Sequence, residues 1–260
     1  MEAIVHRQDQ LVRYSEYGNG KELMLAFHGY GMDGFQFEVL PKSITQQYRV
    51  IGFHLPNYKR GDTRYLQWLE QLHMVIPKVL EGHKTTRFSL IGYSIGAKIS
   101  LYTFQQFAAQ VNQIYLMAPY GLEKHKGLDF VTGKFGNGLF KVIVKSSLPG
   151  WIMKAGKVTG FVKEDLYDII SKELATTPQR ESLCHTLAMV GQIRLDRRVI
   201  VDLLNTNKIQ VKVYYGRKDG LFPYDKRKKV LLETIHSCQS IPVEAGHWMV
   251  TQELDELMAS

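Results

Sequence analysis

The stretch Gly92-Tyr93-Ser94-Ile95-Gly96 joins an apolar run to a helical pattern. Residues 87–91 before it read Arg-Phe-Ser-Leu-Ile, and residues 97–102 after it have helical spacing. A strand is therefore expected to run straight into a helix through a serine, with glycines that let the two elements approach closely. A serine at such a turn has a strained backbone and an accessible hydroxyl. The pattern predicts that Ser94 is a nucleophile, and the plainer alternative is that it only caps the helix.

Length and composition indicate a protein with a large core. The chain has 260 residues, 45% of them apolar, which suits one large domain or one domain with an insertion. Its two cysteines, Cys184 and Cys238, are too few for a disulfide framework and have no zinc-site spacing, so we expect reduced thiols and no metal. Without a recognisable signal sequence or membrane-spanning run, the chain is expected to be soluble and cytoplasmic.

The formal net charge of +8 raises the question of nucleic-acid binding. The basic run Lys226-Arg227-Lys228-Lys229 adjoins the apolar residues 230–232, a pattern typical of one solvated helix face. The sequence has no zinc-finger or RNA-recognition motif. We therefore expect no nucleic-acid partner.

Apolar runs and helical patterns alternate along most of the chain. Helices are expected over 34–40, over 63–80, after Ser94, from Tyr224 and over 253–258. This alternation predicts a mostly parallel sheet of an α/β protein, with an antiparallel edge from an N-terminal hairpin. The strands are expected over residues 3–7, 11–15, 22–27, 48–53, 87–91, 113–118, 210–215 and 240–244.

The alternation stops between residues 121 and 207, where helical segments are broken by glycines and prolines. We expect this region to be an all-helical cap, or lid. Residues 1–120 and 208–260 would then form the core domain.

A serine nucleophile needs a base and a group that orients the base. Of nine histidines, His247 is the best placed, because it follows the last expected strand. Asp219 follows the strand before that, so the chain order is serine, aspartate, histidine. The acidic residues Asp225, Glu123 and Glu244 are weaker candidates for the orienting role.

An oxyanion hole needs preorganised N–H donors. The backbone amide of Ile95 follows the nucleophile at a helix N-terminus, where the helix dipole favours negative charge. The backbone amide of Tyr30 lies in the run His28-Gly29-Tyr30-Gly31 after an earlier strand. We expect these two amides to form the oxyanion hole, although a simple turn would also explain the run.

These motifs together resemble the alpha/beta-hydrolase superfamily, in particular its cap-bearing esterase and lipase-like branch. The resemblance spans nearly the whole chain. It implies an eight-stranded, mostly parallel sheet flanked by helices, with the cap inserted between strands 6 and 7. It also implies acyl transfer to water through an acyl-serine, with no metal or organic cofactor. Many relatives have an aspartate and a glycine-rich turn where residues 53–58 read Phe-His-Leu-Pro-Asn-Tyr, so the substrate subclass stays open.

The first half of the cap is basic and aromatic. Residues 124–163 contain eight lysines and one acidic residue, Asp129. Such a segment could bind an acidic substrate, contact an anionic membrane surface or form an ordinary solvated helix pair. We favour the solvated helix pair over membrane contact. The aromatic side chains expected to contact substrate are Tyr93, Phe140, Trp151 and Trp248.

The leading hypothesis is a serine hydrolase that cleaves a small-molecule carboxylic ester with an apolar acyl group. A thioesterase or a carbon-carbon bond hydrolase with the same three residues is the first alternative, because a fold does not determine its substrate. The second is a ligand-binding relative without catalysis. A monomer or a homodimer is expected.

Overall fold

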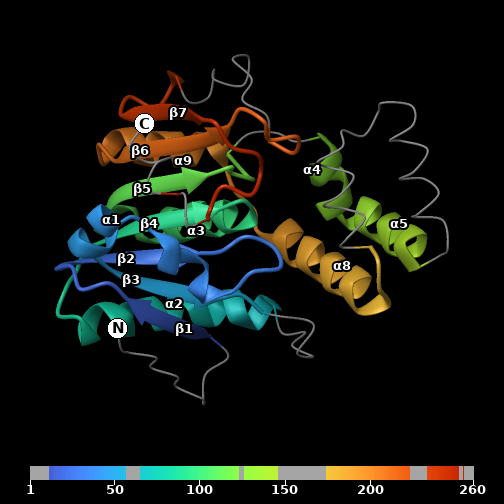
Figure 1. The fold of residues 1–260 in the computed structure, drawn as a ribbon, viewed down its shortest axis with the longest axis horizontal. Helices are drawn as coiled ribbons and strands as arrows, with labels where there is room; N and C mark the ends of the chain where they lie inside the picture. Colours follow the sequence, from blue (N-terminus) through green and yellow to red (C-terminus); the bar gives the residue numbers. More distant parts are fainter. Residues whose placement is uncertain are drawn as a thin grey trace.

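The protein is built around one seven-stranded sheet. In Figure 1 its strands lie one above another, from β7 at the top to β1 at the bottom. The computed structural model describes residues 12–56, 65–122, 126–145, 174–222, 233–251 and 254. Within them the strand order is β1-β3-β2-β4-β5-β6-β7. The strands are β1 (Arg13–Tyr17), β2 (Glu22–Phe27), β3 (Tyr48–His54), β4 (Phe88–Tyr93), β5 (Val111–Met117), β6 (Gln210–Gly216) and β7 (Cys238–Val243).

Strand direction matches the prediction from the sequence. Strand β1 pairs with β3 in antiparallel fashion, and all other neighbouring strands are parallel. The mostly parallel α/β sheet with an antiparallel edge is therefore confirmed. The expected strand over residues 3–7 lies outside the described residues, so the eighth strand stays a prediction.

The sheet buries side chains on both faces, because successive residues of a strand point to opposite sides. On β2, Leu23, Leu25 and Phe27 belong to one core cluster, and Met24 and Ala26 belong to another. This is why the parallel strands read as continuous apolar runs in the sequence.

Helices cover both faces. The larger core cluster includes residues of α2 (Tyr65–Gly82), α3 (Ile95–Phe107) and α9 (Arg197–Thr206). The smaller cluster includes residues of the 3₁₀ helix η1 (Gly34–Val39) and of α1 (Lys42–Gln47). A second 3₁₀ helix, η3 (Ala108–Gln110), leads into β5.

The predicted helices over 34–40, over 63–80 and after Ser94 correspond to η1, α2 and α3. Helix α1 was not predicted, because it is six residues long and contains one buried residue, Ile44, too little for a helical period to be visible. The helices expected from Tyr224 and over 253–258 fall almost wholly outside the described residues.

Between β5 and β6 the described structure is helical. It contains α4 (Lys126–Thr132), α5 (Lys134–Lys145) and α8 (Thr177–Gln192), which lie together beyond one end of the strands in Figure 1. Helix α8 begins with a capping box between Thr176 and Gln179. Helix α9 belongs to the predicted cap by sequence, yet its residues Ile200 and Leu204 pack in the same core cluster as α3. The division into core and cap domains stays a prediction.

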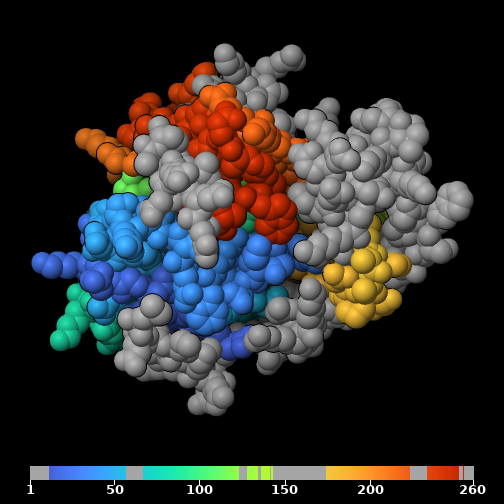
Figure 2. Space-filling model, in the orientation of Figure 1, coloured from blue at the N-terminus to red at the C-terminus, as the bar shows by residue number. Residues whose placement is uncertain are grey.

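Figure 2 shows the same face as a solid surface, with the red C-terminal segment packed against the blue N-terminal third of the chain. Two segments far apart in sequence thus meet where the loops after the parallel strands emerge. In the described part of the chain, no helix is both long enough and apolar enough to cross a membrane.

Candidate active site

Ser94 occupies a strained turn between β4 and α3. Its backbone has φ 54° and ψ −117°, in a region that residues with a side chain rarely adopt. Two backbone hydrogen bonds hold it there: Ser94 N–H donates to Met117 O (2.9 Å), and Tyr120 N–H donates to Ser94 O (3.1 Å). Gly96 lets α3 start against β2, because a Cβ atom at this position would overlap the carbonyl of Phe27. The strand-to-helix turn expected at Ser94 is present.

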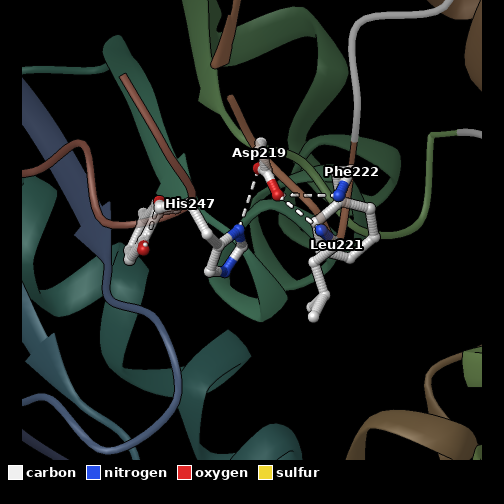
Figure 3. A network of polar contacts seen from close by, with 5 residues as sticks. Asp219, Leu221, Phe222 and His247 are labelled. Carbon is white, nitrogen blue, oxygen red and sulfur yellow. Dashed lines mark hydrogen bonds and ion pairs between the residues drawn. The ribbon is translucent and has the colours of Figure 1, made fainter. Parts of the chain in front are cut away.

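Asp219 and His247 form a pair on neighbouring loops, as Figure 3 shows, with the aspartate buried and the histidine partly exposed. His247 Nδ1 lies 2.9 Å from Asp219 Oδ2, and Asp219 is 1% exposed. The other carboxylate oxygen, Oδ1, accepts hydrogen bonds from the N–H groups of Leu221 (2.8 Å) and Phe222 (2.9 Å). Because an ionised carboxylate only accepts, Nδ1 carries the proton and Nε2 of the neutral ring is left as a base.

The surroundings of Asp219 keep it ionised. Burial by itself raises the pKa of this carboxyl group, but the hydrogen bond and charge of His247 and the two N–H donors lower it more. The net result is a pKa below the usual value for aspartate. Asp219 therefore stays an acceptor at neutral pH.

Backbone hydrogen bonds join the two loops that carry Asp219 and His247. Arg217 N–H donates to Val243 O (2.9 Å), and Lys218 N–H donates to Ala245 O (3.0 Å). Arg217 Nε also lies 2.8 Å from a carboxylate oxygen of Glu244, at the surface. Glu244, a weaker candidate for the orienting residue, is thus paired with an arginine instead of a histidine.

Tyr93 connects strand β4 to the loop that carries His247. Its hydroxyl donates to the backbone carbonyl of His247 (2.8 Å), and the two ring centroids are 5.5 Å apart. Tyr93 is only 1% exposed and its hydroxyl is bonded to the loop that carries His247, and the expected contact between Tyr93 and substrate stays a prediction. Among the described residues, no hydrogen bond joins the Ser94 hydroxyl to His247, a bond that is often long in free enzymes.

The two residues expected to form the oxyanion hole line one cavity. Tyr30 and Ile95 are brought together there by the loop after β2 and the start of α3. Ile95 is the first residue of α3, where backbone N–H groups have no partner within the helix.

His28 fixes the backbone of this loop, a role that the sequence reasoning missed. Its Nε2 accepts a hydrogen bond from Leu55 N–H (3.0 Å), so Nδ1 carries the proton and donates to Gly29 O (2.7 Å). The Gly29 carbonyl and the Tyr30 N–H belong to one planar peptide and point in opposite directions. Holding the carbonyl therefore fixes the direction of the Tyr30 amide. The run His28-Gly29 marks this loop in the sequence, but the prediction from the sequence concerned its backbone amides and not the His28 side chain.

His28 is kept neutral by its environment. Burial lowers its pKa to about 4, against a smaller opposing effect of the hydrogen bond with Gly29. At neutral pH the Nε2 atom is therefore free of a proton and can accept from Leu55.

Two of the other three aromatic residues expected to bind substrate lie in the described part of the chain. Trp248 follows His247, is 44% exposed, and lies with its ring centroid 6.2 Å from that of His247. Phe140 lies on α5 and is half-buried. Trp151 lies outside the described residues.

Comparison with known proteins identifies the family of this chain. The family model for the alpha/beta hydrolase fold matches residues 22–253, and the chain belongs to this family. Among solved structures, an esterase from Thermogutta terrifontis superposes with a TM-score of 0.64 at 15% identity, covering 95% of this chain and 90% of that one. An esterase from Exiguobacterium antarcticum gives 0.58 at 18% identity, covering 95% and 92%.

Two curated proteins are similar in sequence. A pimeloyl-[acyl-carrier protein] methyl ester esterase from Nitrosomonas europaea is 29% identical over 101 residues, which is 39% of this chain and 38% of that protein. The uncharacterized hydrolase YugF from Bacillus subtilis is 20% identical over 95% of this chain and 91% of its own length.

Proposed function

We propose that this protein is a serine hydrolase that cleaves a small-molecule carboxylic ester through an acyl-serine intermediate. The observation that carries the proposal is the Asp219–His247 pair, held through Tyr93 beside the strained Ser94 turn. A neutral histidine with Nδ1 protonated is the form that can remove a proton from a serine.

In the proposed reaction, Ser94 Oγ attacks the ester carbonyl carbon while its proton moves to His247 Nε2. The N–H groups of Tyr30 and Ile95 stabilise the negative oxygen of the tetrahedral intermediate. When the intermediate collapses, His247 returns the proton to the departing alcohol. Water then attacks the acyl-serine by the same sequence of transfers, which releases the acid and restores Ser94.

The neighbours support an ester more than another bond, since two of the similar solved structures are esterases. Another similar structure is a thioesterase domain from the curacin biosynthetic pathway, at 15% identity and a TM-score of 0.58. Comparing kcat/KM for paired oxygen esters and thioesters of one acid would separate the two leaving groups.

Labelling with a fluorophosphonate probe tests the nucleophile. Wild-type protein and the control Ser43→Ala, which changes an exposed serine on α1, are expected to be labelled, and Ser94→Ala is not. Ester turnover should be lost with the label. Equal labelling of wild type and Ser94→Ala would exclude Ser94 as the nucleophile.

A further inference from the structure

One face of α8 covers the cavity beside the expected oxyanion hole. The residues Ser182, Thr186 and Met189 line it, spaced four and three positions apart on the same side of the helix. One turn earlier, the Tyr30 hydroxyl contacts Gln179 O at 3.5 Å, which ties the same face of α8 to the oxyanion loop. Helix α8 and the two residues expected to form the oxyanion hole therefore share one cavity.

The position of the cavity assigns it to the acyl part of a substrate. Its lining includes Tyr30 and Ile95 but no residue of the loop that carries His247. In an ester hydrolysis the departing oxygen must lie next to the histidine that protonates it. The acyl chain then extends away from His247, into the cavity under α8.

The cavity is small. It offers about 40 Å³ to the centres of water-sized groups. Because one water needs about 10–15 Å³ by this measure, there is room for about three to four such groups. Met189, which is 1% exposed, forms part of the cavity wall.

Two hydroxyl groups make part of this small cavity polar. Ser182 and Thr186 are 7% and 8% exposed. Hydroxyls of serine and threonine within a helix commonly bond to a carbonyl of the preceding turn. Within the part of the chain that the structure describes, neither of these hydroxyls makes a hydrogen bond, whereas the Thr132 hydroxyl on α4 bonds to Leu128 O (2.7 Å). Among the described residues, neither oxygen is one of the fully buried polar atoms without a partner, so both hydroxyls are accessible from the cavity and can bond to a group bound there.

We propose that this cavity selects a short acyl chain bearing an oxygen atom, which hydrogen bonds to the hydroxyls of Ser182 and Thr186. The inference rests on the proposed function and adds the class of acyl group that the site takes. A chain of three carbons beyond the carbonyl, with one hydroxyl, matches both the size and the polarity of the lining.

The test compares kcat/KM for the 4-nitrophenyl esters of 3-hydroxybutanoate, butanoate and octanoate. We expect wild type to favour the 3-hydroxy ester over butanoate, and butanoate over octanoate. In the double variant Ser182→Ala/Thr186→Val the preference for the hydroxy ester should fall roughly tenfold, as expected for the loss of one or two hydrogen bonds. Met189→Ala should raise the ratio of octanoate to butanoate.

Thr177→Val is the matched control, since it makes the same substitution at an exposed position of α8 and should keep the wild-type ratio. Thr186→Ser retains a hydroxyl and should also retain most of the preference. An unchanged ratio in the double variant would overturn the inference, as would a wild-type preference for octanoate.

A second readout separates this inference from the proposed function. In the Ser94→Ala background, calorimetry can compare binding of methyl 3-hydroxybutanoate and methyl butanoate without turnover. Loss of the binding preference on adding Ser182→Ala/Thr186→Val supports the cavity assignment even if wild type hydrolyses no ester. Ser94-dependent hydrolysis with no such preference contradicts the cavity assignment alone.

Discussion

The hydroxyl of Tyr93 donates a 2.8 Å hydrogen bond to the backbone carbonyl of His247, a residue 154 positions away in the chain. The residue next to the candidate nucleophile thus holds the residue proposed as its base. Burial, with the nearby Asp219 carboxylate, raises the pKa of Tyr93 well above its usual value, so its hydroxyl remains a donor. We therefore expect loss of this bond to lower catalytic activity more than it lowers the stability of the fold.

Replacing Tyr93 with phenylalanine removes this bond and keeps the ring contact. We expect kcat to fall about tenfold with little change in KM, because the loss affects positioning of the base. The free energy of unfolding should fall by about 1 kcal/mol for one lost hydrogen bond. Steady-state kinetics and urea unfolding measure both. Tyr14→Phe, on β1, should leave kcat unchanged, and a stability loss without any kcat change would contradict the positioning role.

Asp219→Asn tests the orienting role of the carboxylate. An asparagine can donate to His247 Nδ1 and so stabilise the wrong tautomer, which should lower kcat by roughly 10³ to 10⁴. Asp202→Asn, at an exposed position of α9, is the control and should behave like wild type in the same kinetic assay. A loss smaller than tenfold in Asp219→Asn would point to another orienting group.

The lowered pKa of Asp219 also predicts a pH dependence of stability. The folded state binds this proton more weakly than the unfolded state, so the stabilisation is present above the unfolded pKa of about 3.9 and lost as pH falls further. The difference in unfolding free energy between wild type and Asp219→Asn should therefore shrink below about pH 4. Urea unfolding of both proteins between pH 7 and pH 3 measures it, and a constant difference would contradict the prediction.

The sequence predicted the strands and the Ser94 turn because these features are local. Apolar runs marked the parallel strands, and glycine spacing marked the turn. The partners of Tyr93 and His28 were not predictable, because each bond joins segments distant in the chain: Tyr93 to His247, and His28 to Leu55. For this reason the sequence predicted a contact between Tyr93 and substrate, whereas in the structure the Tyr93 hydroxyl is hydrogen bonded to His247 O.

The cavity under α8 could not be predicted from the sequence for the same reason, because its lining residues are distant in the chain. Ser182 and Thr186 look like ordinary polar residues of a helix, and only the position of α8 over the Tyr30 loop gives them a role. Composition had drawn attention to the aromatic residues of the cap instead, of which Trp151 lies outside the described residues and Phe140 is half-buried.

Two glycines with opposite surroundings provide a packing test. A Cβ on Gly96 would overlap the carbonyl of Phe27, whereas a Cβ on Gly138, in α5, would meet nothing within 4 Å. Gly96→Ala should therefore lower the free energy of unfolding by about 3 kcal/mol or more through backbone shifts. Gly138→Ala should raise it by about 0.5–1 kcal/mol through helix propensity. Urea unfolding distinguishes them, and equal effects would contradict the packing described for the Ser94 turn.

Acidification should destabilise the loop that His28 holds. The buried ring takes up a proton only near pH 4, whereas in the unfolded chain it does so near pH 6.5. Stability contributed by the neutral ring is thus complete above about pH 6.5 and is lost as pH falls towards 4. At roughly 1.4 kcal/mol per pKa unit, the loss amounts to about 3 kcal/mol.

His28→Gln should remove most of this pH dependence, because glutamine takes up no proton in this range. The slope of unfolding free energy against pH, measured by urea unfolding between pH 7 and pH 4, should be flatter in His28→Gln than in wild type. His236→Gln, which changes an exposed histidine, should keep the wild-type slope. If His28→Gln also keeps that slope, the acid sensitivity arises elsewhere and His28 does not hold the Gly29 peptide through a neutral ring.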